Sequence, residues 1–271
     1  MENLPLISQG FRLEALAFKN GAYRTGKIKA TLLARLSPSF YFYRQIIRIV
    51  FTASRKAKRS RYGDNDWIMS SLDTLRALES AGVSFEITGI DNFKDVEGPC
   101  VFIANHMSTL ETFVLPVIIA PFKMATFVVK GSLVEYPVFK HVMRSREPIT
   151  VSRTNPREDL KTVFEGGAER LRKGTSIIIF PQTTRSTFFD PAEFNTIGVK
   201  LAKKAEVPVV PVALKTDAWG NGRRLKDFGR IDPSLSVHFA FGKPLWIKDR
   251  GNEEHREIIG FITEKLKEWR P

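Results

Sequence analysis

Two residues with the chemistry of a general base and its partner, His106 and Glu111, stand five positions apart. They follow the apolar run 99–104, which we expect to be a strand, and the carboxyl end of a strand is where α/β folds place their sites. An imidazole with an ordinary pKa of about 6.5 can accept a proton near neutral pH. Glu111 would orient the ring and stabilise the imidazolium. Taken alone, however, the spacing favours a structural histidine beside a solvated glutamate.

A second group of polar side chains follows two other apolar runs. The segment 183–186, Thr-Thr-Arg-Ser, comes after the run 176–180, and Arg153 comes after the run 148–151. Hydroxyl groups and forked guanidinium groups suit the binding of a phosphate oxyanion. Because we expect these runs to end at the same edge of one sheet, the sequence predicts a site with one base and two guanidinium groups.

Short apolar runs and helical patterns alternate along most of the chain, which predicts an α/β fold, a sheet with helices on its faces. We expect strands over 83–88, 99–104, 125–129, 148–151, 176–180, 207–214 and 235–241. We expect helices to begin near Ser108, Ser132, Pro156 and Asn195, and a last helix over 253–269. The helix at Pro156 has the strongest start signal, because Asn155 can cap it and Glu158 stands at capping-box spacing.

The first part of the chain has a different pattern, with two expected helices. Residues 39–57 mix aromatic and aliphatic side chains with arginines, which is typical of a helix at a membrane interface; a core helix with solvated arginines is the alternative. The basic run 55–61 then favours an electrostatic contact with a membrane, although nuclear targeting or nucleic-acid binding could also use it. A second helix is expected over 66–81, ended by Gly82.

We therefore divide the chain into an N-terminal helical, membrane-interfacial element, residues 1–81, and an α/β domain, residues 82–271. The formal net charge of +13 predicts attraction to polyanions such as anionic lipids or nucleic acid. Cys100 is the only cysteine, so we expect no disulfide framework and a reducing compartment. Residues 1–10 lack the pattern of a secretory signal, and we find no run of about 18 uncharged apolar residues that would predict a membrane-spanning helix.

Together these motifs resemble the glycerolipid acyltransferase family, whose members include lysophosphatidic acid acyltransferases. The family motif Asn-His-x-Ser-x-x-Asp is similar to residues 105–111, and the motif Phe-Pro-Glu-Gly-Thr-Arg-Ser is similar to residues 180–186. A further motif ends in an arginine, as here at Arg153, and a Val-Pro-rich strand resembles residues 207–212. The resemblance spans roughly residues 89–214 in the family's motif order, and it implies a mixed, mostly parallel sheet flanked by helices.

The resemblance implies a role for particular residues. The catalytic residues would be His106 and Glu111. The substrate-binding residues would be Asn105, Ser108, Lys130, Arg153, Thr184, Arg185 and Ser186. Lys130 is included because it stands, with Leu133 and Pro137, where relatives carry similar residues.

Three departures from the family's motifs bear on the identity of the acceptor. Glu111 replaces the usual Asp and keeps its charge. Gln182 replaces a Glu and can still form hydrogen bonds, whereas Thr183 replaces a Gly at a turn where a positive φ would be costly. Residues 195–197 stand where relatives carry a lysine-rich stretch.

The activity that the resemblance implies is transfer of a fatty acyl chain from acyl-CoA or acyl-ACP (acyl carrier protein) to a lysophospholipid hydroxyl, most simply from 1-acyl-glycerol-3-phosphate to phosphatidic acid. His106 would deprotonate the hydroxyl for direct attack while Arg153 and Arg185 hold the phosphate, with no metal and no cofactor. The expected partners are a membrane lipid surface, the acceptor and the acyl donor, and no nucleic acid. We expect a peripheral or monotopic protein on the cytoplasmic face of a membrane.

Two alternatives stay open at this point. The acceptor could be another lysolipid, such as a lyso-ornithine lipid, a lysophosphatidylcholine-type lipid or a glycolipid. The chain could also be a catalytically silent homologue that binds lipid or nucleic acid. This alternative is suggested by the substitutions at Gln182 and Thr183 and by the basic charge. A serine hydrolase is disfavoured, because the sequence has no Gly-x-Ser-x-Gly elbow.

Overall fold

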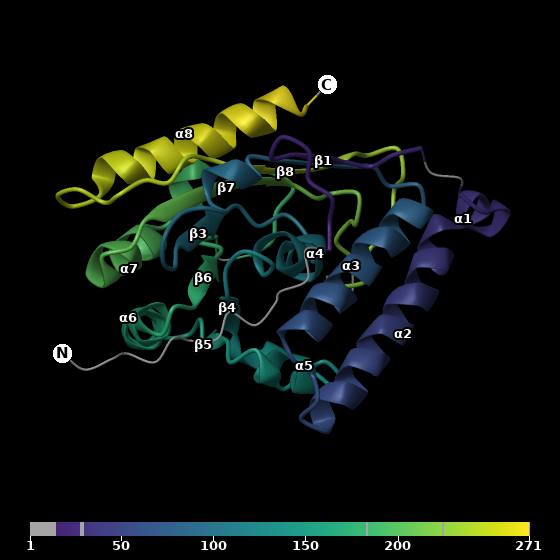
Figure 1. Ribbon diagram of the computed structural model, residues 1–271, viewed down its shortest axis with the longest axis horizontal. Coiled ribbons are helices and arrows are strands. Elements are labelled where there is room, and N and C mark those ends of the chain that lie inside the picture. The colour runs from purple at the N-terminus through teal and green to yellow at the C-terminus, as the bar shows by residue number, and fades with distance from the viewer. Residues whose placement is uncertain (1–14, 28–29, 183, 224, 271) are drawn as a thin grey trace.

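The computed structural model describes residues 15–27, 30–182, 184–223 and 225–270. A mixed sheet forms the middle layer, and helices cover both of its faces (Figure 1). One face carries α2 (Pro38–Lys58), α3 (Asp64–Ser80) and α4 (Leu110–Ile119), and the other carries α6 (Pro156–Arg172), α7 (Ile197–Ala205) and α8 (Asn252–Glu268). This is the α/β architecture predicted from the alternation of apolar runs.

The sheet has eight strands within the described residues, in the order β1-β2-β8-β7-β3-β6-β4-β5. The strands are β1 (Tyr23–Arg24), β2 (Phe85–Thr88), β3 (Val101–Ala104), β4 (Ala125–Lys130), β5 (Ile149–Val151), β6 (Ser176–Ile179), β7 (Val209–Lys215) and β8 (Val237–Phe241). The pairs β1-β2 and β7-β8 are antiparallel, and the other pairs are parallel. The prediction of a mixed, mostly parallel sheet is therefore confirmed.

The sequence predicted seven of these strands, and each is present within a few residues of its expected limits. It did not predict β1, which is only two residues long, nor the short helix α1 (Leu32–Leu36). The helix expected near Ser132 is wrong, because this segment is a 3-10 turn, η2 (Gly131–Val134), followed by a separate short helix, α5 (Lys140–Ser145). Pro137 accounts for the break, since a residue before proline is disfavoured in the helical region. Two further 3-10 turns are η1 (Ile90–Asn92) and η3 (Pro191–Glu193).

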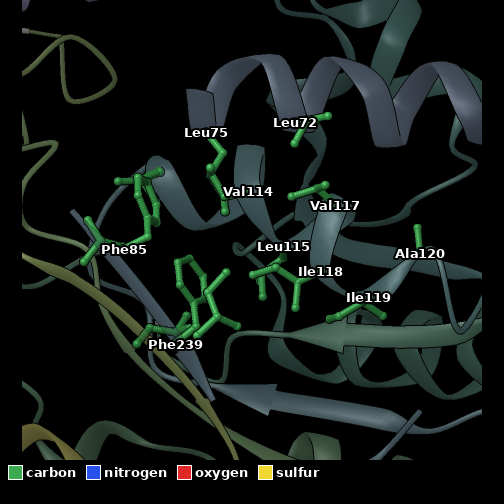
Figure 2. Close-up of a cluster of buried hydrophobic side chains, with 14 of the residues drawn as sticks. Leu72, Leu75, Phe85, Val114, Leu115, Val117, Ile118, Ile119, Ala120 and Phe239 are labelled. Atoms are coloured by element: carbon green, nitrogen blue, oxygen red, sulfur yellow. The ribbon is translucent and has the colours of Figure 1, made fainter. Parts of the chain in front are cut away.

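The central strand β3 is buried on both faces and supplies two hydrophobic clusters. Phe102 and Ala104 belong to the cluster under α3 and α4, whereas Val101 and Ile103 belong to the cluster under α6, α7 and α8. Figure 2 shows part of the first cluster, with side chains that come from several elements, among them Leu75 of α3, Val114 of α4 and Phe239 of β8. Burial on both faces explains why this strand is an uninterrupted apolar run in the sequence.

A serine of α3 forms hydrogen bonds with the backbone of α4 next to a proline. Pro116 lies inside α4 and has no N–H to donate. Ser71 is buried, and its hydroxyl donates to the carbonyl of Phe113 (2.6 Å) and accepts from the N–H of Val117 (2.9 Å). One side chain thus bonds to two backbone groups of α4 on either side of the proline, and it links α3 to α4.

Helix α2 has one face in the core and one face in solvent. Phe42 is fully buried, and its ring centroid lies 4.7 Å from that of Trp219. Phe40, Ile47 and Phe51 are 60%, 50% and 52% exposed. The core interpretation of this segment therefore applies to one face of the helix, and contact of the exposed face with a membrane stays a prediction. The division at residue 82 stays a prediction, since α2 and α3 share their buried cluster with the sheet.

In the described part of the chain, no helix has the length and hydrophobicity that crossing a bilayer requires. The expectation about residues 1–10 lies outside the described residues.

Gly198 lets α7 approach the sheet behind the strand ends. A Cβ added there would lie 2.6 Å from Cδ1 of Ile103 and 3.0 Å from Cγ2 of Ile179. We therefore expect Gly198→Ala to lower the free energy of unfolding by about 1–3 kcal/mol through overpacking, measured by urea denaturation. Gly260→Ala on α8 is the control, because its added Cβ would have no other described residue within 4 Å apart from its chain neighbours and the backbone of its own helix. Equal effects of the two substitutions would contradict this account.

Candidate active site

Five parallel strands, β3 to β7, end at one edge of the sheet, and a cavity of about 650 Å³ opens there. Five of the residues predicted from the sequence line this cavity: His106, Lys130, Arg153, Thr184 and Arg185. The other four, Asn105, Ser108, Glu111 and Ser186, are not among its lining residues. The predicted site residues thus form an inner group that faces the cavity and an outer group around it.

His106 and Glu111 form a hydrogen-bonded pair, with 2.9 Å between Nδ1 of the imidazole and Oε1 of the carboxylate. The imidazole also stacks on Phe180, with ring centroids 4.3 Å apart and an angle of 17° between the planes. Two neighbours therefore fix the ring at the cavity wall. Because Nδ1 faces Glu111, Nε2 is the nitrogen available to a molecule in the cavity.

Glu111 is fully buried in the first turn of α4. Its Oε1 accepts from the backbone N–H groups of Met107 (2.7 Å) and Ser108 (3.0 Å), and its Oε2 accepts from the hydroxyl of Thr216 (2.7 Å). Burial pushes the pKa of Glu111 upward, but the bond to His106, the charge of that ring and the other donors outweigh burial and lower the pKa below its ordinary value. The carboxylate therefore stays ionised beside the imidazole.

The sequence did not predict Thr216 as a site residue. It lies directly after β7, is fully buried, and accepts from the hydroxyl of Ser108 through its backbone carbonyl (2.9 Å). The available signal was its place after the predicted strand 207–214, which ends at the same sheet edge as the strand before His106. The same signal applies to the loop that follows, where Lys226 and Asp227 line the cavity.

Asn105 joins two neighbouring strands at the site. Its amide Nδ2 donates to the carbonyl of Leu214, and its Oδ1 accepts from the N–H of Leu214, both at 2.8 Å. The side chain is buried, and these two bonds engage both ends of its amide. In this geometry Asn105 holds β3 against β7 one residue before His106, rather than facing the cavity as its predicted role in substrate binding would require.

Ser108 also supports the pair from behind. It is fully buried, and its Oγ lies 3.1 Å from Oε2 of Glu111 and 3.0 Å from Oγ1 of Thr216. The same oxygen accepts from the N–H of Leu110, as expected for a serine at a helix start.

The turn after β6 is tied to the backbone of His106 at two points. Oε1 of Gln182 accepts from the N–H of His106 (2.6 Å), and the carbonyl of His106 accepts from the N–H of Ser186 (3.0 Å). A neutral amide oxygen is sufficient for the first contact, so the loss of charge at Gln182 does not disturb it. Thr183 lies outside the described residues.

Arg153 occupies a left-handed turn, with φ +61°. Asp159, in the first turn of α6, holds this turn by accepting from the backbone N–H groups of Ser152 and Arg153, both at 2.7 Å. Partial burial and the positive charge of Arg185 lower the pKa of Arg153, and Asp159 opposes this shift. Both guanidinium groups line the same cavity. The capping of α6 by Asn155 is confirmed, with its side chain accepting from the N–H of Glu158 (3.4 Å).

The wall of the cavity combines cationic and apolar side chains. Lys130 at the end of β4, Arg153, Arg185 and Lys226 supply positive charge, and Nζ of Lys226 donates to the hydroxyl of Thr184 (3.1 Å). The apolar side chains of the wall include Trp67, Phe113, Phe127, Val129, Val142 and Met143. Such a cavity suits a molecule with an anionic head and a hydrocarbon chain.

Comparison with protein families agrees with this geometry. A model of the family described as Acyltransferase matches residues 84–215. The chain is therefore similar to the acyltransferase family over just under half of its length. The matched segment runs from β2 to the end of β7, and it contains every site residue that the sequence predicted.

Related acyltransferases include a 1-acyl-sn-glycerol-3-phosphate acyltransferase of Pseudomonas aeruginosa, 33% identical over 155 residues, which are 57% of this chain and 58% of the relative. A probable 1-acyl-sn-glycerol-3-phosphate acyltransferase of Mycoplasma genitalium is 31% identical over 151 residues, 54% of this chain and 56% of the relative. The chain thus spans little more than half the length of these relatives.

A solved acyltransferase structure shares the fold. The crystal structure of the 1-acyl-sn-glycerophosphate (LPA) acyltransferase, PlsC, from Thermotoga maritima aligns with 85% of this chain and 93% of that chain, with a TM-score of 0.63. Its sequence identity is 20%, so this likeness concerns the arrangement of strands and helices.

The hydroxyl of Thr216 should stabilise the ionised form of Glu111. Replacing it by Thr216→Val removes a donor from a buried carboxylate, so we expect a loss of about 1–3 kcal/mol in the free energy of unfolding at pH 7. Because the folded-state pKa of Glu111 is lowered, this contribution exists above the ordinary carboxyl pKa and disappears as the pH falls through the folded-state value. Urea denaturation at a series of pH values measures both effects.

Two variants serve as controls for this measurement. Thr216→Ser keeps the hydroxyl and should retain most of the stability. Thr74→Val removes another buried hydroxyl, which donates to the backbone carbonyl of Ser70 (2.8 Å) and not to a carboxylate of the described residues. Its effect should not depend on pH, and a Thr216→Val loss that is equally independent of pH would contradict the proposed contact.

Proposed function

We propose that this protein transfers a fatty acyl chain from a thioester, acyl-CoA or acyl-ACP, to the hydroxyl of a lysophospholipid, with 1-acyl-glycerol-3-phosphate as the acceptor and phosphatidic acid as the product. The observation that carries the proposal is that His106, paired with Glu111, lines a cavity that also has cationic and apolar side chains in its wall. A base beside an anion site and a hydrocarbon site suits deprotonation of a hydroxyl on a phosphate-bearing lipid.

In the proposed reaction, Nε2 of His106 accepts the proton of the acceptor hydroxyl as its oxygen attacks the thioester carbonyl carbon. The tetrahedral intermediate then collapses, the carbon–sulfur bond breaks, and the leaving thiolate takes up the proton from the imidazolium. Glu111, ionised and hydrogen-bonded to Nδ1, stabilises the positive ring between these two steps. No covalent bond to the enzyme forms, and the positioning of two bound substrates lowers much of the barrier.

The cationic residues of the cavity would hold the acceptor phosphate. Arg153 and Arg185 offer forked guanidinium donors, and Lys130 and Lys226 add charge at the same opening. The apolar side chains of the cavity wall would contact a hydrocarbon chain of the substrates. The relatives named as 1-acyl-sn-glycerol-3-phosphate acyltransferases support this acceptor.

We further propose that the protein works on the cytoplasmic face of a membrane, with α1 and α2 in the lipid interface. Large apolar side chains are exposed on these two helices: Leu32, Leu36, Phe40, Ile47 and Phe51. Ile47 and Phe51 also line the cavity, so its mouth lies beside this exposed apolar face. An acceptor with its chain in the bilayer could then reach His106 without crossing water.

The reaction is tested by release of free thiol from palmitoyl-CoA in the presence of lysophosphatidate, with the purified protein in detergent or vesicles. We expect turnover by the wild-type protein and a loss of about 100- to 10,000-fold in His106→Ala, since the general base is removed. His141→Ala is the matched control, because His141 does not line the cavity.

Other outcomes of the same assay separate the alternatives. Turnover of a different lysolipid, without turnover of lysophosphatidate, would keep the reaction and replace the acceptor. If no thiol is released with any acceptor, with either the CoA donor or the carrier-protein donor, the proposed activity is refuted.

Membrane contact is tested by replacing exposed side chains of α2. We expect the triple variant Phe40→Gln, Ile47→Gln, Phe51→Gln to bind vesicles that contain anionic phospholipid at least about tenfold more weakly. The reason is that transfer of each large apolar side chain out of water is favourable by about 1.5–3 kcal/mol. Sedimentation with vesicles measures the binding. Trp246→Gln is the control, because Trp246 is equally exposed, at 60%, but lies outside α1 and α2. Phe42 is left unchanged because it is a core residue. Unchanged binding of the triple variant would exclude this face as the contact.

A further inference from the structure

The guanidinium group of Arg185 already has a carboxylate partner inside the cavity. Its Nη1 lies 2.7 Å from Oδ1 of Asp227 and also donates to the hydroxyl of Thr109. That hydroxyl in turn lies 3.1 Å from Oδ1 of Asp227. Arg185, Thr109 and Asp227 therefore form a closed group of polar contacts that occupies part of the anion-binding surface.

Among the described residues that line the cavity, Asp227 is the one with a carboxylate side chain. Around it, Lys130, Arg153, Arg185 and Lys226 line the same space. An anionic headgroup that binds Arg185 must therefore come close to this negative charge. At such a position the carboxylate and the headgroup compete for the same donor.

The loop that carries Asp227 is anchored on both sides but exposed between the anchors. Nδ2 of Asn221 donates to the carbonyl of Met107 (2.9 Å), and the carbonyl of Gly229 accepts from the hydroxyl of Tyr43 (2.5 Å). Next to Asp227, the side chain of Phe228 is 50% exposed, and the side chain of Asp227 itself is 36% exposed. Water can therefore solvate the carboxylate if it leaves Arg185, so the exchange costs little free energy.

We propose that Asp227 is a resident counter-ion of Arg185, which the phosphate of the acceptor displaces on binding and which reclaims Arg185 when the product leaves. This inference rests on the proposed function, because it takes the acceptor to be a phosphate monoester. A monoester carries about −1.5 to −2 charges at pH 7 and three acceptor oxygens, so it competes well against a single carboxylate. Asp227 thus sets the affinity for phosphate-bearing acceptors without touching the reacting atoms.

The sign of the effect distinguishes this role from a positioning role. If Asp227 is a competitor, Asp227→Asn binds phosphate more tightly than the wild-type protein, by about fivefold, as expected for removal of a partly exposed ion pair. If Asp227 instead holds Arg185 in its working orientation, the same substitution weakens binding. Asp227→Glu keeps the carboxylate and should bind phosphate within about twofold of the wild-type protein.

The experiment measures two quantities on the full chain. Binding of inorganic phosphate is measured by calorimetry at low ionic strength, and the KM for lysophosphatidate is measured in the thiol-release assay. We expect both the Kd and the KM to fall by about fivefold in Asp227→Asn. Asp95→Asn is the matched control: it makes the same change of formal charge at an exposed residue that does not line the cavity, and it should change neither value.

The two readouts keep the proposals separate. If the wild-type protein does not acylate lysophosphatidate, the proposed function fails, and phosphate binding still tests the counter-ion. Phosphate binding that is unchanged or weaker in Asp227→Asn would overturn the counter-ion inference, whatever the acylation assay shows. Thermal unfolding of each variant verifies that the loop change has not unfolded the protein. If Asp227→Asn does not fold, Asp227→Ser is used for the same comparison.

Discussion

The buried carboxylate of Glu111 is the charge on which the rest of the site depends. A carboxylate without contact to water must be paired and hydrogen-bonded to stay ionised. Here the donors come from His106, from the backbone just before α4 and from Thr216 beyond β7. Strand order, helix start and ring orientation are therefore coupled, because each of them supplies a partner for the same two oxygens.

The sheet brings these partners together across long distances in sequence. β7 lies next to β3, so Thr216 reaches a helix that begins more than a hundred residues earlier. β6 lies on the other side of β3, and its following turn places Gln182 and Phe180 against the backbone and the ring of His106. The residues that line the cavity and the residues that support them thus come from neighbouring strand ends, which is the usual place for a site in an α/β sheet.

Much of this arrangement could be predicted from local patterns. Strands such as β3 and β6 are short apolar runs followed by polar residues, so their existence and the position of His106 at a strand end were accessible. The cavity-facing residues Arg153 and Arg185 were accessible for the same reason. The contacts of Thr216 and Asp227 were not, because they depend on which strands are neighbours and on the path of a loop without periodicity. Asn105 and Ser108 stand in the right motif, yet their burial and backbone partners appear only in the folded chain.

The hydroxyl of Ser71 links the outer helices to the helix that carries Glu111. It bonds to the carbonyl of Phe113 and to the N–H of Val117 in the helix that carries Glu111, so a displacement of α3 along α4 would break these two hydrogen bonds. α2 packs on α3 in turn, and it bears the exposed apolar side chains. The outer helices are therefore joined to the helix that carries Glu111 by direct contacts, so a substitution that shifts α3 would also disturb the backbone around the acid that pairs with the histidine.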